Sequence, residues 1–427
     1  MHTSPERKPS TLSALRSPNF RLYFVGQLVS NSGTWMQNIA QSYLVFKITG
    51  SELWLGIVAC AAGLPIVLMS PIGGVIIERV PRQTILKFTQ TIQMILAFIL
   101  AILTFSNLIQ VWHIVVLAVM LGVTNSLDIP ARQTIVVEMV GKEDLYSGIA
   151  LNSIMNSLGR ILGPTAAGIA LVQFGAGWCF LLNGLSFVAV LISLFLMKVP
   201  YAIKYAGNSS PIRQLREGLS FARHDPLIPP LLLLAAVAGL LVLPILRLLP
   251  AVADILLNSP EAGYAALSVG EGGGALIAGV LVGFLSQRFG HGKLIAAAVI
   301  VNALANGFLA WQTNIPPAVL ITAFFGGSMI MLFVCLNTVI QTIVPDNFRG
   351  RVLSLYSLAM IGTSPFGALA LGAFADRFGI QAALIVNGLL IALLSGAILL
   401  RWPQVLHFHS QTETVTIPEE VLPAIGD

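Results

Sequence analysis

The sequence has few charged residues for its length. Lysine, arginine, aspartate and glutamate make up 10% of the 427 residues, whereas hydrophobic residues make up 56%. Because a soluble domain carries roughly a quarter of its residues charged, this chain has too few charges to cover a surface that faces water. Lipid is therefore predicted to be its main solvent. An apolar helix needs about 20 residues to cross the hydrocarbon core, so the chain has room for about a dozen crossings.

Other absences narrow the class of function. The chain has three cysteines, all within apolar runs, which argues against a disulfide framework or a metal site. Basic residues lie in short loops rather than in one stripe, so nucleic-acid binding is not expected. No nucleophile–base pair and no phosphate-binding lysine motif stands at a useful spacing. We therefore expect neither an enzyme nor a cofactor, and residues 1–17 do not read as a cleaved signal peptide.

Apolar runs divide into twelve predicted transmembrane helices, six on each side of one long polar connection. The predicted fold class is an all-α membrane protein with two six-helix bundles. Its expected parts are a cytoplasmic segment 1–19, a first bundle 20–197, a cytoplasmic linker 198–227, a second bundle 228–400 and a cytoplasmic tail 401–427 that is expected to be disordered. The linker is expected to contain an amphipathic helix at the membrane surface, with an ordinary solvated linker as the alternative.

Lysine and arginine gather in the loops on the side of the N-terminus, so both termini are predicted to be cytoplasmic. The two halves also resemble each other: 168–185 matches 372–389, and 74–83 matches 283–292. With the same sequence offset as the first match, residues 140–151 align with residues 344–355. The similarity therefore extends to loops, which argues against a chance resemblance. Like-oriented repeats surround an axis along the membrane normal and hold a substrate near the midplane between them.

The loop 74–83 resembles the signature of the major facilitator superfamily, Gly-x-x-x-Asp-Arg-x-Gly-Arg-Arg/Lys. The residues that carry it are Gly74, Glu78 in place of Asp, Arg79 and Arg82, with Gly283 and Arg288 in the second copy. The resemblance implies that this loop joins helix ends in one transport state, and that the second copy, which lacks the acid, forms a weaker latch. The stretches 16–24, 128–136 and 344–352 are similar to the enterobactin-exporter and macrolide-efflux branch of that superfamily.

Four residues of the fifth predicted helix resemble the antiporter signature, which the superfamily associates with export. They are Gly159, Gly163, Pro164 and Gly168. Glycines four residues apart let another helix backbone approach closely, and proline removes one helical hydrogen bond. We expect a tight, bendable contact between the halves here, with plain helix packing as the alternative.

Polar residues at membrane depth indicate a cavity. Arg160 is expected to face it and to attract an anionic substrate group or a carboxylate; snorkelling or a bond to a carbonyl is the alternative. The first helix carries five polar residues at steps of four and three, on one face: Gln27, Asn31, Thr34, Asn38 and Gln41. They are expected to face the cavity or another helix, and Trp35 beside them is placed to stack on an aromatic substrate.

Three more charged residues lie within predicted helices. Arg247 and Glu271 are expected to pair, because they lie at similar distances from one short turn. Alternatively, Glu271 takes up and releases protons for coupling. Asp128 is interpreted mainly as the ion-pair partner of Arg132 one turn later, and as the second candidate for a proton carrier.

The predicted function is export of a small amphipathic molecule, such as a siderophore, a drug or a metabolite, across the bacterial cytoplasmic membrane. Alternating access and proton antiport are expected, with the small-molecule substrate, protons and the lipid bilayer as partners and a monomer as the functional unit. A facilitator or uptake permease is the first alternative. A membrane receptor or scaffold that does not transport is the alternative of another class.

Overall fold

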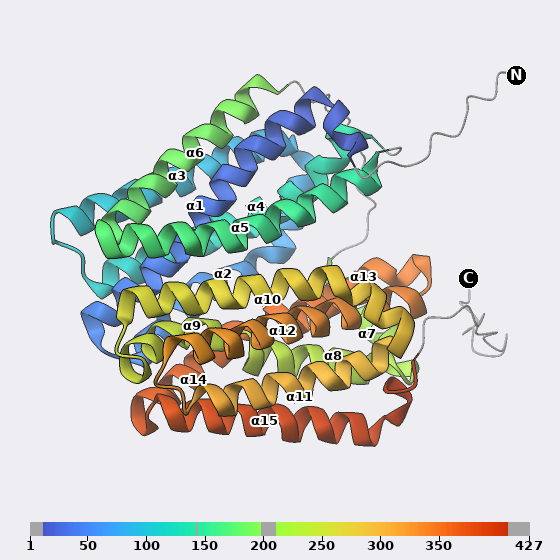
Figure 1. Ribbon diagram of the computed structural model, residues 1–427. Helices are drawn as coiled ribbons and strands as arrows, with labels where there is room; N and C mark the ends of the chain where they lie inside the picture. Colours follow the sequence, from blue (N-terminus) through green and yellow to red (C-terminus); the bar gives the residue numbers. More distant parts are fainter. Residues whose placement is uncertain (1–11, 142–143, 198–210, 409–427) are drawn as a thin grey trace, which may run out of the picture.

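The computed structural model describes residues 12–141, 144–197 and 211–408, and these are almost entirely helical (Figure 1). A short 3-10 turn, Ser13–Arg16, precedes the first bundle. The helices of that bundle are α1 (Pro18–Thr49), α2 (Glu52–Arg79), α3 (Arg82–Phe105), α4 (Val111–Val140), α5 (Leu145–Gln173) and α6 (Ala176–Leu196). They run alternately up and down, because the connections between them are short, such as residues 50–51 and 80–81.

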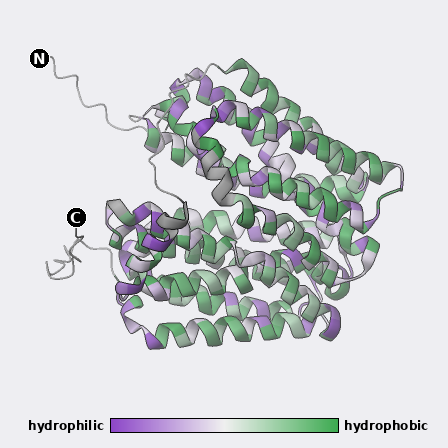
Figure 2. Ribbon diagram, turned by 180° about the vertical axis from the view of Figure 1, so that it is seen from behind, coloured by the Kyte–Doolittle hydropathy of each residue, from purple (hydrophilic) through white to green (hydrophobic). Residues whose placement is uncertain are grey.

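The second bundle has the same alternation. Its helical segments are α8 (Ile228–Val237), η2 (Ala238–Val242), α9 (Ile245–Ala251), η3 (Val252–Leu256), α10 (Pro260–Phe289), α11 (His291–Leu309), α12 (Ile315–Ile343), α13 (Asp346–Ile361), α14 (Ser364–Phe378) and α15 (Ile380–Arg401), and the 3-10 turn η4 (Pro403–Val405) follows. Hydrophobic residues line most of the length of these helices (Figure 2).

Ten helical runs in the described part of the chain are long and apolar enough to cross a membrane. Helices α1, with 32 residues, and α5, with 29, are as long but more polar. These two helices carry the predicted polar face and the predicted antiporter signature. Polar residues inside a membrane bundle are costly and tend to be functional, so α1 and α5 are the first helices to inspect for a site.

Two crossings of the second bundle are interrupted. The seventh consists of α8 and α9, each followed by a π-helical turn, and it contains Pro244 and Pro250. The eleventh breaks between α13 and α14, just before Pro365. Proline lacks the backbone N–H that a continuous helix needs, so these positions favour a change in helical geometry.

Helix α7 (Pro211–His224) lies between the bundles in sequence and packs against α13. The ring of Phe221 stacks on Phe348, with 4.5 Å between centroids, and Glu217 pairs with Arg351 at 3.1 Å. The start of α1 and the end of α15 lie at the same end of the molecule as α7 (Figure 1). We call this the α7 end, and the other the opposite end.

The two bundles approach each other most closely away from α7 and diverge toward the α7 end (Figure 1). They meet along α2 with α14 and along α5 with α10. Glycine makes the first contact possible: a Cβ on Gly56 would lie 2.5 Å from the carbonyl oxygen of Ala368, and one on Gly372 would lie 2.6 Å from that of Glu52. Backbones in such close contact form a closed seam near the opposite end.

Candidate functional site

An ion pair between Arg160 of α5 and Glu271 of α10 joins the two bundles. The guanidinium Nη2 donates to Oε1 of Glu271, and the two side chains are 18% and 8% exposed. The guanidinium also lies over the ring of Trp35 on α1, with its carbon 5.4 Å from the centroid. Arginine over an indole face is attracted by the ring quadrupole. Three helices from two bundles therefore meet at one charged group.

The predicted pair between Arg247 and Glu271 is not formed. Glu271 instead reaches Arg160, because α5 and α10 are in backbone contact at this level: a Cβ on Gly272 would lie 2.6 Å from the carbonyl oxygen of Arg160. Sequence separation along two neighbouring helices suggested the Arg247 pair, whereas packing between the bundles decides which charges meet.

Arg247 is exposed although its helix is enclosed. Helix α9 contacts α1, α2, α10, α14 and α15, yet the Arg247 side chain is in the exposed class. An exposed side chain on a helix with neighbours from both bundles faces the space between them rather than lipid. Arg160 and Arg247 together place positive charge in this region, and Glu271 is the carboxylate bonded to one of them.

The polar face of α1 divides into a buried and a half-buried part. Gln27 is 2% exposed and Asn31 is 9% exposed, and the Asn31 amide donates to the carbonyl of Met155 on α5 at 3.4 Å. The remaining members are half-buried: Thr34, Trp35, Asn38 and Gln41. The end of the face near Gln27 thus packs within the first bundle, whereas the part around Trp35 lies beside the Arg160–Glu271 pair.

The glycines of the predicted antiporter signature do not all lie between the halves. A Cβ on Gly159 would collide with Asn31, and one on Gly163 would lie 2.8 Å from the carbonyl oxygen of Ser32; both partners belong to α1 of the same bundle. Gly168, with its Cβ position 2.6 Å from Cβ of Ala265 on α10, lies on the contact between bundles. The expectation of a contact between halves is therefore wrong for Gly159 and Gly163.

Pro164 is buried within α5, one residue after Gly163. The helix is continuous from Leu145 to Gln173 across it. The predicted bend at Pro164 stays a prediction about another transport state.

Among the described side chains of the first copy of the predicted loop motif, Arg82 forms an ion pair. Arg82 Nη1 donates to Glu138 Oε1 on α4 at 2.7 Å, and Arg79 is exposed. Gly74 and Glu78 lie in α2, and their side chains are outside the described set. In the second copy, Gly283 has open space around it and the Arg288 guanidinium lies 5.5 Å from the Phe289 ring centroid.

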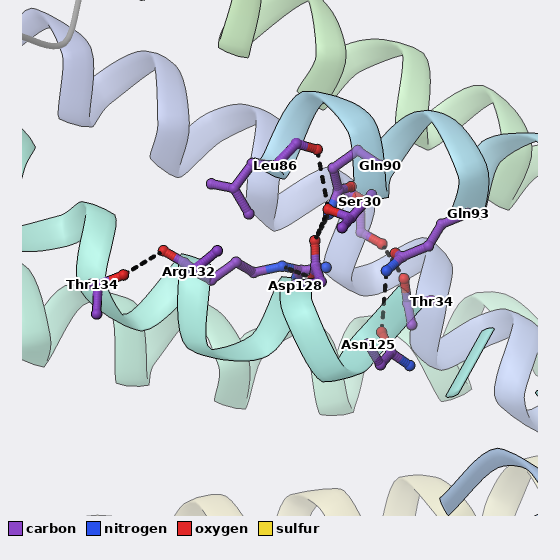
Figure 3. Close-up of polar contacts among 11 residues, drawn as sticks. Ser30, Thr34, Leu86, Gln90, Gln93, Asn125, Asp128, Arg132 and Thr134 are labelled. Carbon is purple, nitrogen blue, oxygen red and sulfur yellow. Dashed lines mark hydrogen bonds and ion pairs between the residues drawn. The ribbon is translucent and has the colours of Figure 1, made fainter. Parts of the chain in front are cut away.

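A second polar cluster lies inside the first bundle, around Asp128 (Figure 3). Asp128 is 0% exposed; its Oδ1 accepts from Thr89 Oγ1 at 2.7 Å and from Gln90 Nε2 at 2.9 Å, and its Oδ2 pairs with Arg132. These contacts tie Asp128 to α3 at one oxygen and to Arg132 of its own helix at the other. The geometry therefore favours a structural role for Asp128 over proton exchange.

Three groups beside the site and at the closed end were not among the predicted site residues. Asn152 and Asn156 precede Arg160 at steps of four on α5, half-buried and exposed, and the spacing alone could have indicated a shared face. At the opposite end, Tyr43 donates to Glu261 and Ser51 Oγ donates to Asp376 Oδ1 at 2.5 Å. Both bonds join the bundles. No sequence signal identified them, because each links residues more than 200 positions apart.

Sequence comparisons identify the family of the chain and several transport proteins that it resembles. The sequence model of the family described as "Transmembrane secretion effector" matches residues 9–422. The enterobactin exporter EntS of Escherichia coli K12 is 24% identical, covering 95% of this chain and 97% of its own. Macrolide efflux protein A of Streptococcus pyogenes is 22% identical, covering 87% of this chain and 93% of its own.

Structural comparisons agree on the fold. The nucleoside transporter NupG has a TM-score of 0.74 at 14% identity, covering 90% of this chain and 98% of its own. A bacterial homologue of the iron transporter ferroportin, in an inward-facing state, has a TM-score of 0.66 at 18% identity, covering 89% and 99%. These likenesses confirm the predicted twelve-helix fold.

Proposed function

Because the chain belongs to the transmembrane secretion effector family of the major facilitator superfamily, we propose that it is a secondary exporter driven by proton entry. The family and its relatives make it a multi-pass transport protein rather than an enzyme. The finer proposal is export of a small amphipathic molecule by alternating access with proton antiport. The observation that carries it is the Arg160–Glu271 pair, which joins the bundles that alternating access must move apart.

The pair supplies a coupling mechanism. In the described arrangement the opposite end is closed, and Glu271 is neutralised by Arg160. An acidic group of a substrate that enters from the α7 end takes the place of Glu271 on Arg160 and weakens this contact between the bundles. The pair then separates as the opposite end opens, and the substrate leaves there.

The proton enters after the substrate has left. Separated from Arg160, Glu271 is an uncompensated charge in a poorly solvated site, which is unfavourable. It takes up a proton from the opposite side, and the neutral side chain crosses back at lower cost than a carboxylate. When the bundles close again, Arg160 returns to Glu271 and the proton leaves at the α7 end. One proton thus enters for each substrate exported.

The surroundings of the pair favour a particular class of substrate. Arg160 and the exposed Arg247 attract an acidic group, and the half-buried Trp35 offers an aromatic face. Asn38 and Gln41 on α1, with Asn156 on α5, add hydrogen-bonding groups near the same region. A small amphipathic molecule with an acidic group and an aromatic or apolar part fits these features. The relatives named for enterobactin and macrolide efflux support small organic cargo.

The orientation follows from the distribution of positive charge. We propose that the α7 end faces the cytoplasm of a bacterium, with the protein in the cytoplasmic membrane and both termini inside. Residues of the expected N-terminal segment and tail lie largely outside the described part of the chain. A monomer is the proposed functional unit, because each chain supplies both bundles and the pair between them.

The test has two stages. First, cells that lack their major efflux pumps express the protein and are screened against acidic aromatic siderophores, drugs and metabolites for reduced accumulation. The transported compound is then loaded into proteoliposomes with the purified protein, and flux is measured with and without a pH gradient. We expect the gradient to accelerate efflux by wild type but not by Glu271→Gln. Asp144→Asn, which neutralises a carboxylate at the start of α5 far from the pair, is the control and should keep the acceleration.

Each alternative gives a distinct result. Uptake along the imposed proton gradient would replace the exporter with an uptake permease. Flux that ignores the gradient in wild type would indicate a facilitator. Absence of saturable flux for every compound would favour a receptor or scaffold. Gradient-driven efflux that is unchanged in Glu271→Gln would remove the coupling role of the pair.

A further inference from the structure

A groove with a volume of about 620 Å³ runs along the second bundle, away from the Arg160–Glu271 pair. Its walls are α10 and α11, and α12 forms its floor. Figure 1 shows α12 between these two helices. The rim includes side chains on the outer surface of α10, such as Ile277 at 61% and Leu281 at 44% exposed. The groove therefore opens toward the acyl chains of the bilayer.

Small residues create the groove. Helices α10 and α11 join at Gly290, with a φ of 81°, and then separate, since both pack mainly on α12 rather than on each other. Where they separate, the lining contains Gly274, Ala278, Ala297 and Gly327. Larger wall residues, such as Leu281, Leu285 and Leu294, border this space.

The first bundle carries larger residues opposite two small lining residues, and a threonine opposite Lys293. The match of 74–83 with 283–292, continued into the next helix, pairs Phe88 with Ala297 and Thr84 with Lys293. The match of 140–151 with 344–355, continued back into the preceding helix, pairs Val123 with Gly327. The groove thus reflects residues of the second half and not a general property of the repeat.

One lysine marks the α7 end of the groove. Lys293 lines it and is exposed, in the first turn of α11, which contains no acidic residue. An exposed ammonium at one end of an apolar groove attracts an anionic group. The N–H of Gly292 in the same turn already donates to the carbonyl of Phe408 at 3.3 Å, so the lysine is the partner for that group. Arg288, also exposed, lies just before this turn. Apart from Lys293 and Ser328, the lining is apolar or glycine.

We propose that the groove binds one anionic glycerophospholipid from the leaflet at the α7 end. Its phosphate lies at Lys293, and one acyl chain lies along α10 and α11 over α12. The lining runs along α10 from Phe289 to Gly274, which at 1.5 Å per residue is about 22 Å. That length exceeds the roughly 15 Å depth of one leaflet's hydrocarbon. Charge, depth and polarity therefore match a lipid with an acidic head group.

The lipid head group and the acyl chain are bound by different parts of the groove. Two variants therefore test the two contacts separately. Lys293→Gln removes the charge and leaves the groove. Ala297→Phe fills the groove with the ring that the first half carries at the equivalent position. Their controls are Lys87→Gln, a cation at the α7 end of α3, and Ile300→Phe, which adds a ring to the exposed surface of α11 outside the lining.

Native mass spectrometry of the purified protein, delipidated and then mixed with equal amounts of phosphatidylglycerol and phosphatidylcholine, gives the readout. We expect wild type and both controls to retain one phosphatidylglycerol at least fivefold over phosphatidylcholine. Lys293→Gln should bind both lipids equally, and Ala297→Phe should retain neither above background. Equal binding of the two lipids by wild type, or wild-type retention in both groove variants, would overturn the proposal. The substituted side chains lie on the outer surface, so thermal unfolding without lipid should be unchanged and reports folding independently.

Discussion

Replacing Gly272 by alanine should open the seam between the bundles. A Cβ there would lie 2.6 Å from the carbonyl oxygen of Arg160, a backbone atom that has no freedom to swing away. Helices α5 and α10 must therefore move apart in the described state. The neighbouring Gly273 provides a matched control, because a Cβ on it meets no atom within 4 Å. Both substitutions change the same residue type in the same helix, one position apart.

The magnitude follows from the comparison of the two variants. Each replacement of glycine by alanine in a helix interior gains about 1 kcal/mol in helix propensity. Gly272→Ala also incurs the cost of overpacking, about 1–3 kcal/mol, and that cost falls on the state closed at the opposite end. The difference between the variants isolates the overpacking term. It corresponds to a population shift of about 5- to 150-fold toward states in which the seam is open.

A cross-linking assay reads this population. Cysteines replace Ser51 and Asp376, which are hydrogen-bonded across the bundles at 2.5 Å, after the three native cysteines have been removed. A short thiol-reactive cross-linker should join them rapidly in wild type and in Gly273→Ala, and at least fivefold more slowly in Gly272→Ala. Equal cross-linking rates in the two glycine variants would refute the claim that α5 and α10 pack through their backbones.

Three further predictions concern the polar contacts. Arg160→Gln and Glu271→Gln should each lower the free energy of unfolding by about 2–4 kcal/mol, since a partly buried charge loses its partner. The double variant should recover about 1–3 kcal/mol of the summed loss. Additive losses would show that the two side chains do not interact. Asp128→Asn should cost about 3 kcal/mol or more, because fully buried Asp128 compensates Arg132, and a change below 1 kcal/mol by denaturation in mixed micelles would disprove that. Tyr43→Phe loses one hydrogen bond to α10, worth about 1 kcal/mol, and should slow the cross-linking of cysteines at positions 51 and 376. An unchanged cross-linking rate would show that this bond does not help to hold the opposite end closed.

Sequence patterns identified what depends on composition and spacing along one helix. The apolar runs predicted the fold class. Arg160 lies within one of these predicted transmembrane helices, which indicated a buried charge with a partner. One of the two partners anticipated for it was a carboxylate, and Glu271 is that carboxylate. The pairing of Asp128 with Arg132 needed only the i, i+4 spacing of one helix.

Contacts between distant segments were not accessible in this way. An ion pair between Arg247 and Glu271 was predicted because the two residues lie on neighbouring antiparallel helices joined by one short turn. The approach of α5 to α10, which brings Arg160 to Glu271 instead, depends on Gly272 and on the packing of whole bundles. The same limit applies to Gly159 and Gly163. Their spacing predicts a close helix neighbour, and whether that neighbour is α1 or a helix of the other bundle is a matter of tertiary arrangement.

The most direct test of the account measures proton movement and substrate movement together. Proteoliposomes that contain the purified protein, a trapped pH-sensitive dye and the transported compound are placed in acidic buffer, and efflux and internal acidification are followed at once. We predict that wild type couples the two, and that Glu271→Gln releases substrate without acidifying the interior. Acidification by Glu271→Gln at the wild-type ratio to efflux would contradict the assignment of the proton to the carboxylate that pairs with Arg160.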